Sequence, residues 1–147
     1  MEPEILEMIP IGKKVSIERE IYPKIAGNRL YGFPFEGYFI DAGTPESYLE
    51  ANFKTLGNGG TAAHSGASIR GKCMIHESAK LEDCIVGPNA IIGPDVRMEK
   101  CVVRKSVILS NVTGYGSVVE DCIIGPGSSF EKDLKRTLIS PEGTITF

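Results

Sequence analysis

The feature that most constrains the fold is a repeat of five or six residues in the second half of the chain. From Ile69 onward, large apolar residues follow a smaller residue two positions earlier, in steps of 6, 6, 5, 6, 6, 5 and 6. A helix would place apolar residues three and four positions apart, so this spacing excludes a helix. Positions i and i−2 of a strand share one face, so both residues point into one core. The predicted large inward residues are Ile69, Ile75, Leu81, Val86, Ile92, Met98, Val103, Leu109, Val119, Ile124 and Phe130.

Three such steps span 17 residues and predict a coil of three short strands. A single rung cannot bury its own face, so successive coils must stack. We therefore predict a mainly β protein whose residues 68–132 form a left-handed parallel β-helix of about four coils. The 21 residues from Val103 to Ile124 predict an insertion or an irregular corner between Arg104 and Gly116.

The cysteines each begin one of these repeat units. They form no C-x-x-C pair, and the chain has only two histidines, so a zinc site has little support. A buried free cysteine behaves as a small hydrophobe, which suits the small inward position of the rung. We predict reduced, structural thiols, as expected in the cytoplasm. They are Cys73, Cys84, Cys101 and Cys122.

Apolar residues that alternate with the inward set predict an outer stripe on the β-helix. Such a stripe is costly unless something covers it. Cover could come from the N-terminal segment, from a C-terminal tail over 133–147, or from a partner subunit. A homo-oligomer that forms through the faces of the β-helix is therefore expected. The predicted stripe comprises Ile85, Ile91, Val102, Ile108 and Ile123.

Residues 1–57 lack the repeat and show helix signals instead. Residues 3–8 can form one or two helical turns, and Ser16 is a suitable N-cap for a helix that begins at Ile17. Thr44 precedes Pro45, which is favoured at the first helical position, and this helix should run to about Lys54.

Two strands are expected between these helices, over residues 29–33 and 37–41. The Gly- and Ala-rich stretch 58–67 then predicts a linker between an α+β domain and the β-helix.

The turn Asp41-Ala42-Gly43-Thr44-Pro45 places an aspartate before a helix N-terminus. Such a turn can hold a divalent cation or an anionic ligand. The sequence around it, EGYFIDAGTPESY at 36–48, resembles the end of the catalytic domain of sugar-phosphate nucleotidyltransferases. The segments EIL at 4–6 and SIEREIYP at 16–23 share this resemblance. It is strongest to the mannose-1-phosphate guanylyltransferases, and members of this family carry a left-handed β-helix after the catalytic domain.

The resemblance implies a reaction in which a sugar 1-phosphate attacks the α-phosphate of a nucleoside triphosphate and releases pyrophosphate. Magnesium would neutralise the phosphates, while positioning does most of the catalytic work. By motif, Asp41 would be a magnesium ligand. Glu18, Gly43 and Thr44 would belong to the substrate site.

Other parts of the family pattern have no counterpart in this sequence. There is no Gly-rich G-x-G-x-R-L stretch to hold the triphosphate, no second magnesium aspartate and no lysine for the sugar phosphate. We therefore expect the C-terminal portion of a longer enzyme, inactive by itself, in which the β-helix serves oligomerisation or regulation.

Two other functions are compatible with a β-helix. A hexapeptide-repeat acyltransferase would use a histidine as general base, and His76 at a predicted corner is the candidate. A zinc site of the carbonic anhydrase kind needs three histidines, whereas this chain offers only His64 and His76. The net charge of −3 gives no basic patch for nucleic acid, and no apolar run approaches a membrane span, so a cytoplasmic protein is expected.

Overall fold

The computed structural model describes residues 3–27, 30–57 and 63–147. The chain divides into two compact units, Met1–Tyr38 and Phe39–Phe147. The division falls before the helix at Pro45; residues 58–62 of the predicted linker lie outside the described part, so the linker stays a prediction. Each unit is described by itself.

The first unit contains three short helical elements. They are α1 (Glu4–Glu7), the π-helix η1 (Ile17–Ile21) and α2 (Tyr22–Ile25). The Ser16 hydroxyl accepts a hydrogen bond from the backbone N–H of Arg19 at 3.4 Å, which confirms the predicted N-cap. The predicted strands are absent, because residues 30–41 contain no strand; residue 29 lies outside the described part. A strand needs a neighbour for its backbone groups, and none of the strands within the described residues pairs with this segment.

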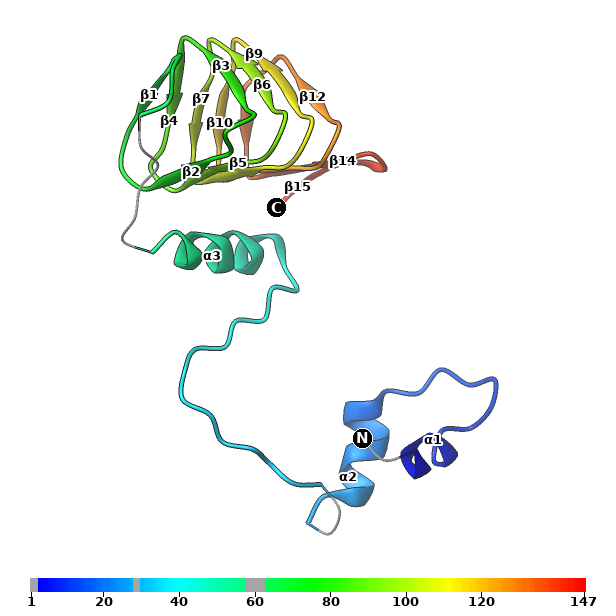
Figure 1. Ribbon diagram of the computed structural model, residues 1–147. Coiled ribbons are helices and arrows are strands. Elements are labelled where there is room, and N and C mark those ends of the chain that lie inside the picture. Colours follow the sequence, from blue (N-terminus) through cyan, green and yellow to red (C-terminus); the bar gives the residue numbers. More distant parts are fainter. Residues whose placement is uncertain (1–2, 28–29, 58–62) are drawn as a thin grey trace. The chain divides into compact units, whose positions relative to one another are not determined.

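Residues 67–146 contain the strands of a parallel β-solenoid, as predicted (Figure 1). Its sheets have the strand orders β1-β4-β7-β10-β13, β15-β14-β11-β8-β5-β2 and β12-β9-β6-β3. The left-handed sense stays a prediction. The strands are β1 (Ala67–Ile69), β2 (Cys73–Ile75), β3 (Lys80–Glu82), β4 (Cys84–Val86), β5 (Ala90–Ile92), β6 (Arg97–Glu99), β7 (Val102–Arg104), β8 (Ser106–Ile108), β9 (Thr113–Tyr115), β10 (Val118–Glu120), β11 (Ile123–Ile124), β12 (Ser129–Phe130), β13 (Leu134–Lys135), β14 (Thr137–Ser140) and β15 (Gly143–Thr146).

Of the two alternatives predicted between Arg104 and Gly116, the insertion is wrong, whereas the corner between Val103 and Ile108 is irregular because it is one residue shorter than the one between Val86 and Ile92. Val103 pairs with Val119, 16 residues later, so this coil is one residue shorter than the preceding ones. Ile124 pairs instead with Ile108, on another sheet. Val103 and Ile124 are therefore not equivalent positions of successive coils, and their separation reflects two sides of the prism rather than extra residues.

Because this coil is one residue shorter, one residue that was predicted to point inward lies on the outside instead. Ile108 is fully buried in the interior cluster, whereas Leu109 is half-buried and packs on the outside. The predicted outward position of Ile108 is thus also wrong. The other large predicted residues from Ile75 to Phe130 do form the interior core.

The small inward residues have a polar task that sequence reasoning missed. Six of them follow a corner residue with positive φ, such as Asp83 (50°) or Lys100 (54°), and donate a hydrogen bond to the carbonyl two positions earlier. The Cys84 thiol donates to the Glu82 carbonyl at 3.3 Å, and the Ser106 hydroxyl donates to the Arg104 carbonyl at 2.8 Å. Carbonyls of this set also accept a backbone N–H from the next coil, such as the Lys100 N–H on the Glu82 carbonyl at 2.9 Å, so the small side chain supplies a second hydrogen bond at the corner. The residues that make this contact are Cys84, Cys101, Ser106, Ser117, Cys122 and Thr137.

The cysteines are free and buried, as predicted. Burial raises the pKa of the Cys122 thiol, and a hydrogen bond with Cys84 together with burial raises that of Cys101. Both effects favour the protonated thiol over the nucleophilic thiolate. These two side chains therefore suit packing and hydrogen bonding at the corner.

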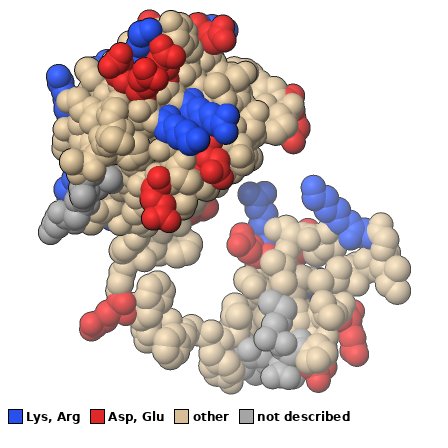
Figure 2. Space-filling view, turned by 45° about the horizontal axis from the view of Figure 1, so that its top comes forward, with Lys and Arg blue, Asp and Glu red and all other residues tan. Residues whose placement is uncertain are grey.

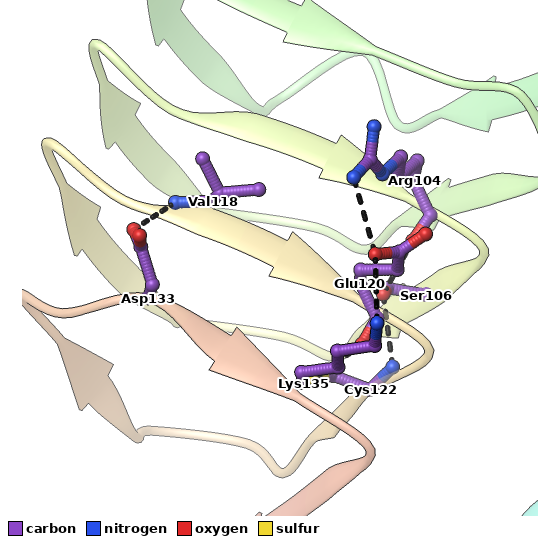
Figure 3. A network of polar contacts seen from close by, with 7 residues as sticks. All are labelled: Arg104, Ser106, Val118, Glu120, Cys122, Asp133 and Lys135. Carbon is purple, nitrogen blue, oxygen red and sulfur yellow. Dashed lines mark hydrogen bonds and ion pairs between the residues drawn. The ribbon is translucent and has the colours of Figure 1, made fainter.

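The solenoid continues beyond the predicted end at residue 132. β13 pairs with β10 and β14 pairs with β11, and β15 folds back antiparallel on β14. Most of the predicted tail is thus a further coil and a hairpin. This last coil is shorter by one residue, since Val119 pairs with Leu134. The Asp133 carboxylate compensates by accepting the Val118 backbone N–H at 2.8 Å (Figure 3).

Charged side chains cross-link the outer surface of these last coils. Arg104 donates to the Glu120 carboxylate at 3.1 Å, and the Lys135 ammonium lies 3.9 Å from the same carboxylate (Figure 3). The hydrogen bond from Arg104 lowers the pKa of Glu120. β7, β10 and β13 are thereby joined in order along one face.

Candidate functional site

The Asp41 turn leads directly into helix α3 (Pro45–Thr55). The Asp41 Oδ1 atom accepts the Gly43 N–H at 3.1 Å. The Thr44 hydroxyl accepts the Ser47 N–H at 3.2 Å, while the Ser47 hydroxyl accepts the Thr44 N–H at 3.0 Å. This reciprocal pair is a capping box that satisfies two backbone donors at the helix start. Local side chains therefore fix the turn and the first helical turn as one piece.

Helix α3 packs against the outside of the solenoid, on the sheet that contains β8 and β11 (Figure 1). Buried Leu49 meets Val107 and Ile123, which are 1% and 7% exposed. Partly buried neighbours complete this cluster: Tyr48, Phe53, Ile91, Leu109, Leu138 and Phe147. Of the predicted outer stripe, Ile91 and Ile123 lie on this face, and the segment before the solenoid covers them, whereas Ile85 and Val102 lie on another sheet.

A pocket of about 400 Å³ lies between the start of α3 and the solenoid. The turn contributes Ala42 to Pro45, and the helix contributes Tyr48. Its solenoid wall consists of Leu109, Ile123 and Leu138. The acidic turn is therefore adjacent to an apolar surface that belongs to the last three coils.

Arg136 forms the polar part of this interface. Its guanidinium pairs with the Glu46 carboxylate at 3.1 Å, donates to the Phe147 carbonyl and lies over the Phe147 ring, 5.7 Å from its centroid. It also lines a second pocket, of about 690 Å³, beside Glu46, Leu49 and Phe147. A single side chain thus joins the last coil, the helix and the final hairpin.

Sequence reasoning missed the roles of Arg136 and Leu138. The signal was available, because Arg136-Thr137-Leu138-Ile139 repeats the pattern of Asp121-Cys122-Ile123-Ile124. A charged corner residue, a small inward residue and an alternating apolar pair recur in both.

The predicted site residues are only partly brought together. Asp41, Gly43 and Thr44 share the turn, whereas Glu18 lies in the Met1–Tyr38 unit. Asp41 is exposed. Among the described residues, no group of three or more His, Cys, Asp or Glu side chains could hold a metal ion. These residues alone do not fit a magnesium site.

The two histidines lie at the edge of the first coils. His76 is exposed, and its Nδ1 accepts the Ser78 N–H at 3.2 Å and lies 2.9 Å from the Ser78 hydroxyl. His64 contacts the carbonyls of Ser65 and Ala79 at 2.7 and 3.2 Å. The structure therefore ties both rings to nearby backbone, and the acyltransfer role of His76 stays a prediction.

The exposed charges do not gather by sign on the face seen in Figure 2. Basic and acidic side chains lie side by side over the solenoid there. Within the described parts of the chain, no helix has the length and apolarity needed to span a membrane.

Comparison with known proteins connects this geometry to a family. Residues 69–140 match the family model described as GMPPB C-terminal domain. The chain is 33% identical over 138 residues to probable mannose-1-phosphate guanylyltransferase 2 of Oryza sativa subsp. japonica, covering 81% of this chain and 38% of that protein.

Two further relatives are also named mannose-1-phosphate guanylyltransferases. Mannose-1-phosphate guanylyltransferase 1 of Arabidopsis thaliana is 32% identical, with coverage of 81% of this chain and 38% of the relative. Mannose-1-phosphate guanylyltransferase of Mycobacterium tuberculosis is 29% identical, with coverage of 69% and 31%. The chain thus spans less than two fifths of the length of these relatives.

Proposed function

We propose, from the premise that residues 69–140 belong to the GMPPB C-terminal domain family, that this chain is the C-terminal portion of a sugar-1-phosphate nucleotidyltransferase. The reaction of the whole protein would join a nucleoside triphosphate and a sugar 1-phosphate into a nucleotide sugar, with release of pyrophosphate. Mannose 1-phosphate and GTP are the substrates that the names of the relatives suggest.

The observation that carries the proposal is a segment before the solenoid whose aromatic side chains are exposed, whereas the solenoid buries its own core. From residue 31 to the start of α3 the chain contains no helix or strand, and it exposes aromatic side chains to solvent: Phe33 is 89% exposed and Phe39 is 82% exposed. A run of exposed aromatic residues is costly in water and marks a surface that another part of a protein covers. The rest of a catalytic domain, with strands beside this segment, would provide that cover.

The chain alone would not catalyse nucleotidyl transfer. Asp41 offers one carboxylate, and the other groups that hold magnesium and the triphosphate would come from the remainder of a catalytic domain. We assign no reaction step to the metal within these 147 residues. The solenoid would serve assembly or regulation, as a homo-oligomer in the cytoplasm.

Support for assembly comes from a second outer face of the solenoid. Ile85, Val102 and Val118 lie in register on β4, β7 and β10 and are only half-buried. A row of partly exposed aliphatic side chains on a rigid sheet suits contact with a second copy.

The inactivity is tested by incubating the 147-residue chain with GTP, mannose 1-phosphate and magnesium and measuring pyrophosphate. A complete mannose-1-phosphate guanylyltransferase serves as the positive control. We expect no release above that of buffer; release by the chain alone would overturn the proposed inactivity.

Assembly is tested by sedimentation velocity over a range of protein concentrations. The sedimentation coefficient should rise with concentration, and Val102→Asp should keep it at the monomer value. A monomer at every concentration would contradict the assembly role.

A further inference from the structure

We propose that the last coil of the solenoid positions the Asp41 turn, so that residues near the C-terminal end set the placement of the acidic group near the start of the same unit. Its functional meaning rests on the proposed function, in which Asp41 belongs to the nucleotidyl-transfer site. The coupling itself rests on contacts within residues 39–147, which form one compact unit.

The turn and the helix move together because side chains join them. The Asp41 carboxylate holds the Gly43 N–H, and Thr44 and Ser47 hold each other through the capping box. A shift of the first turn of α3 therefore displaces the carboxylate of Asp41 as well. Whatever holds the start of this helix also holds the acidic group.

An apolar contact to the last coils holds the start of the helix. Tyr48 and Leu138 belong to the cluster that contains Ile123, and Leu138 pairs with Ile123 across β14 and β11. These two strands belong to the last two coils of the solenoid. The pocket beside Thr44 therefore has a solenoid wall of residues that follow Thr44 by 65 or more positions in the chain.

An ion pair holds the same end of the helix from the side. Glu46, in the first turn of α3, pairs with Arg136, and the two residues are 90 positions apart. Arg136 occupies a corner of the last coil with φ of 46° and also donates to the Phe147 carbonyl. The pair is about half exposed, so it should contribute less than the apolar contact. Together the two contacts couple the last coil to the Asp41 turn.

The test is hydrogen exchange on the full chain, read at single amides. In Leu138→Ala, the amides of Gly43, Thr44 and Ser47 should exchange about tenfold faster, because the helix start is released by local opening. The amides of Lys80 and Arg97, which bond to the Val96 and Val112 carbonyls at 2.8 Å, should keep their wild-type rates.

Val102→Ala provides the matched control, since Val102 is a half-buried outward residue on a different sheet. It should leave the exchange of the turn unchanged. Equal acceleration at the turn and at Arg97 would mean that Leu138→Ala destabilises the whole unit. That result, or an unchanged turn in a folded Leu138→Ala protein, would overturn the positioning role.

The ion pair is tested separately by Glu46→Gln, Arg136→Gln and the double variant. Each single variant should accelerate exchange at Gly43 by about twofold to threefold, and the double variant should add little, as expected for partners in one contact. Additive effects would contradict the proposed pairing. None of these measurements depends on nucleotidyl transfer, so failure of the proposed function would show in pyrophosphate release and failure of the coupling in exchange.

Discussion

The solenoid and the segment before it use the same apolar residue types in opposite ways. In the solenoid, Phe130 is 5% exposed inside a continuous core, whereas Phe33 in the first unit is 89% exposed. Each rung of the solenoid is covered by the next coil, so the repeat closes its own core. The extended segment has no neighbouring strand in the described part of the chain, and aromatic side chains such as Phe33 stay in water. Burial within this chain therefore depends on what is stacked nearby rather than on composition.

The largest expected effect comes from the same substitution in the two regions. Phe130→Ala should lower the free energy of unfolding of the solenoid by about 3–5 kcal/mol, since it leaves a cavity in a packed interior. Phe33→Ala should change it by less than about 0.5 kcal/mol. Urea unfolding followed by far-ultraviolet circular dichroism measures both. Equal effects would mean that Phe33 is covered in the isolated chain.

A smaller effect is expected at Gly114, which pairs with Phe130. A Cβ atom at this position would lie 2.3 Å from the Phe130 Cζ atom, so the ring occupies the space of the missing side chain. Gly114→Ala should cost about 1–3 kcal/mol of unfolding free energy through overpacking.

The pairing can be checked with a double variant. Phe130→Leu should relieve part of the cost of Gly114→Ala, so the two free-energy changes should not add. If they add, the clash is not the cause of the loss.

The corner hydrogen bonds should contribute next. Ser106 donates to the Arg104 carbonyl and accepts the Cys122 N–H at 3.0 Å. Ser106→Ala removes both hydrogen bonds and leaves the buried Cys122 N–H without this partner, while the Arg104 carbonyl keeps the Asp121 N–H at 3.4 Å, so the variant should cost about 1–3 kcal/mol. Ser129→Ala is the control, because Ser129 is exposed on β12 and should change stability by less than about 0.5 kcal/mol. Similar losses of stability in the two variants would show that the corner hydrogen bonds of Ser106 make no particular contribution.

The smallest effect concerns the charged ladder on the outer face. The pKa of Glu120 is lowered by Arg104, so its ion pair stabilises the fold above the ordinary glutamate pKa of about 4.3. The contribution is lost as pH falls through the lowered pKa. The stability difference between wild type and Glu120→Gln should therefore shrink in acid, as melting temperatures at pH 7 and pH 3 would measure. A difference that does not depend on pH would argue against the ion pair.

Sequence reasoning succeeded where a local pattern repeats and failed where distant parts meet. The alternation of small and large inward residues predicted the solenoid and the buried free cysteines, and Ser16 and Thr44 marked helix starts that the structure confirms. The insertion and the inward placement of Leu109 were wrong, because a coil can lose a residue without changing the local pattern. The strands expected near residues 29–41 were wrong because a strand depends on a partner that the local sequence does not contain.

The sequence by itself determined the coil, since each rung carries its inward pair and its corner within six residues. It also determined the capped turn at Asp41, whose contacts span only a few positions. Only the tertiary structure decided that α3 covers one outer face and that Arg136 reaches Glu46. These contacts join residues far apart in the chain, and no local periodicity encodes which distant surfaces will meet.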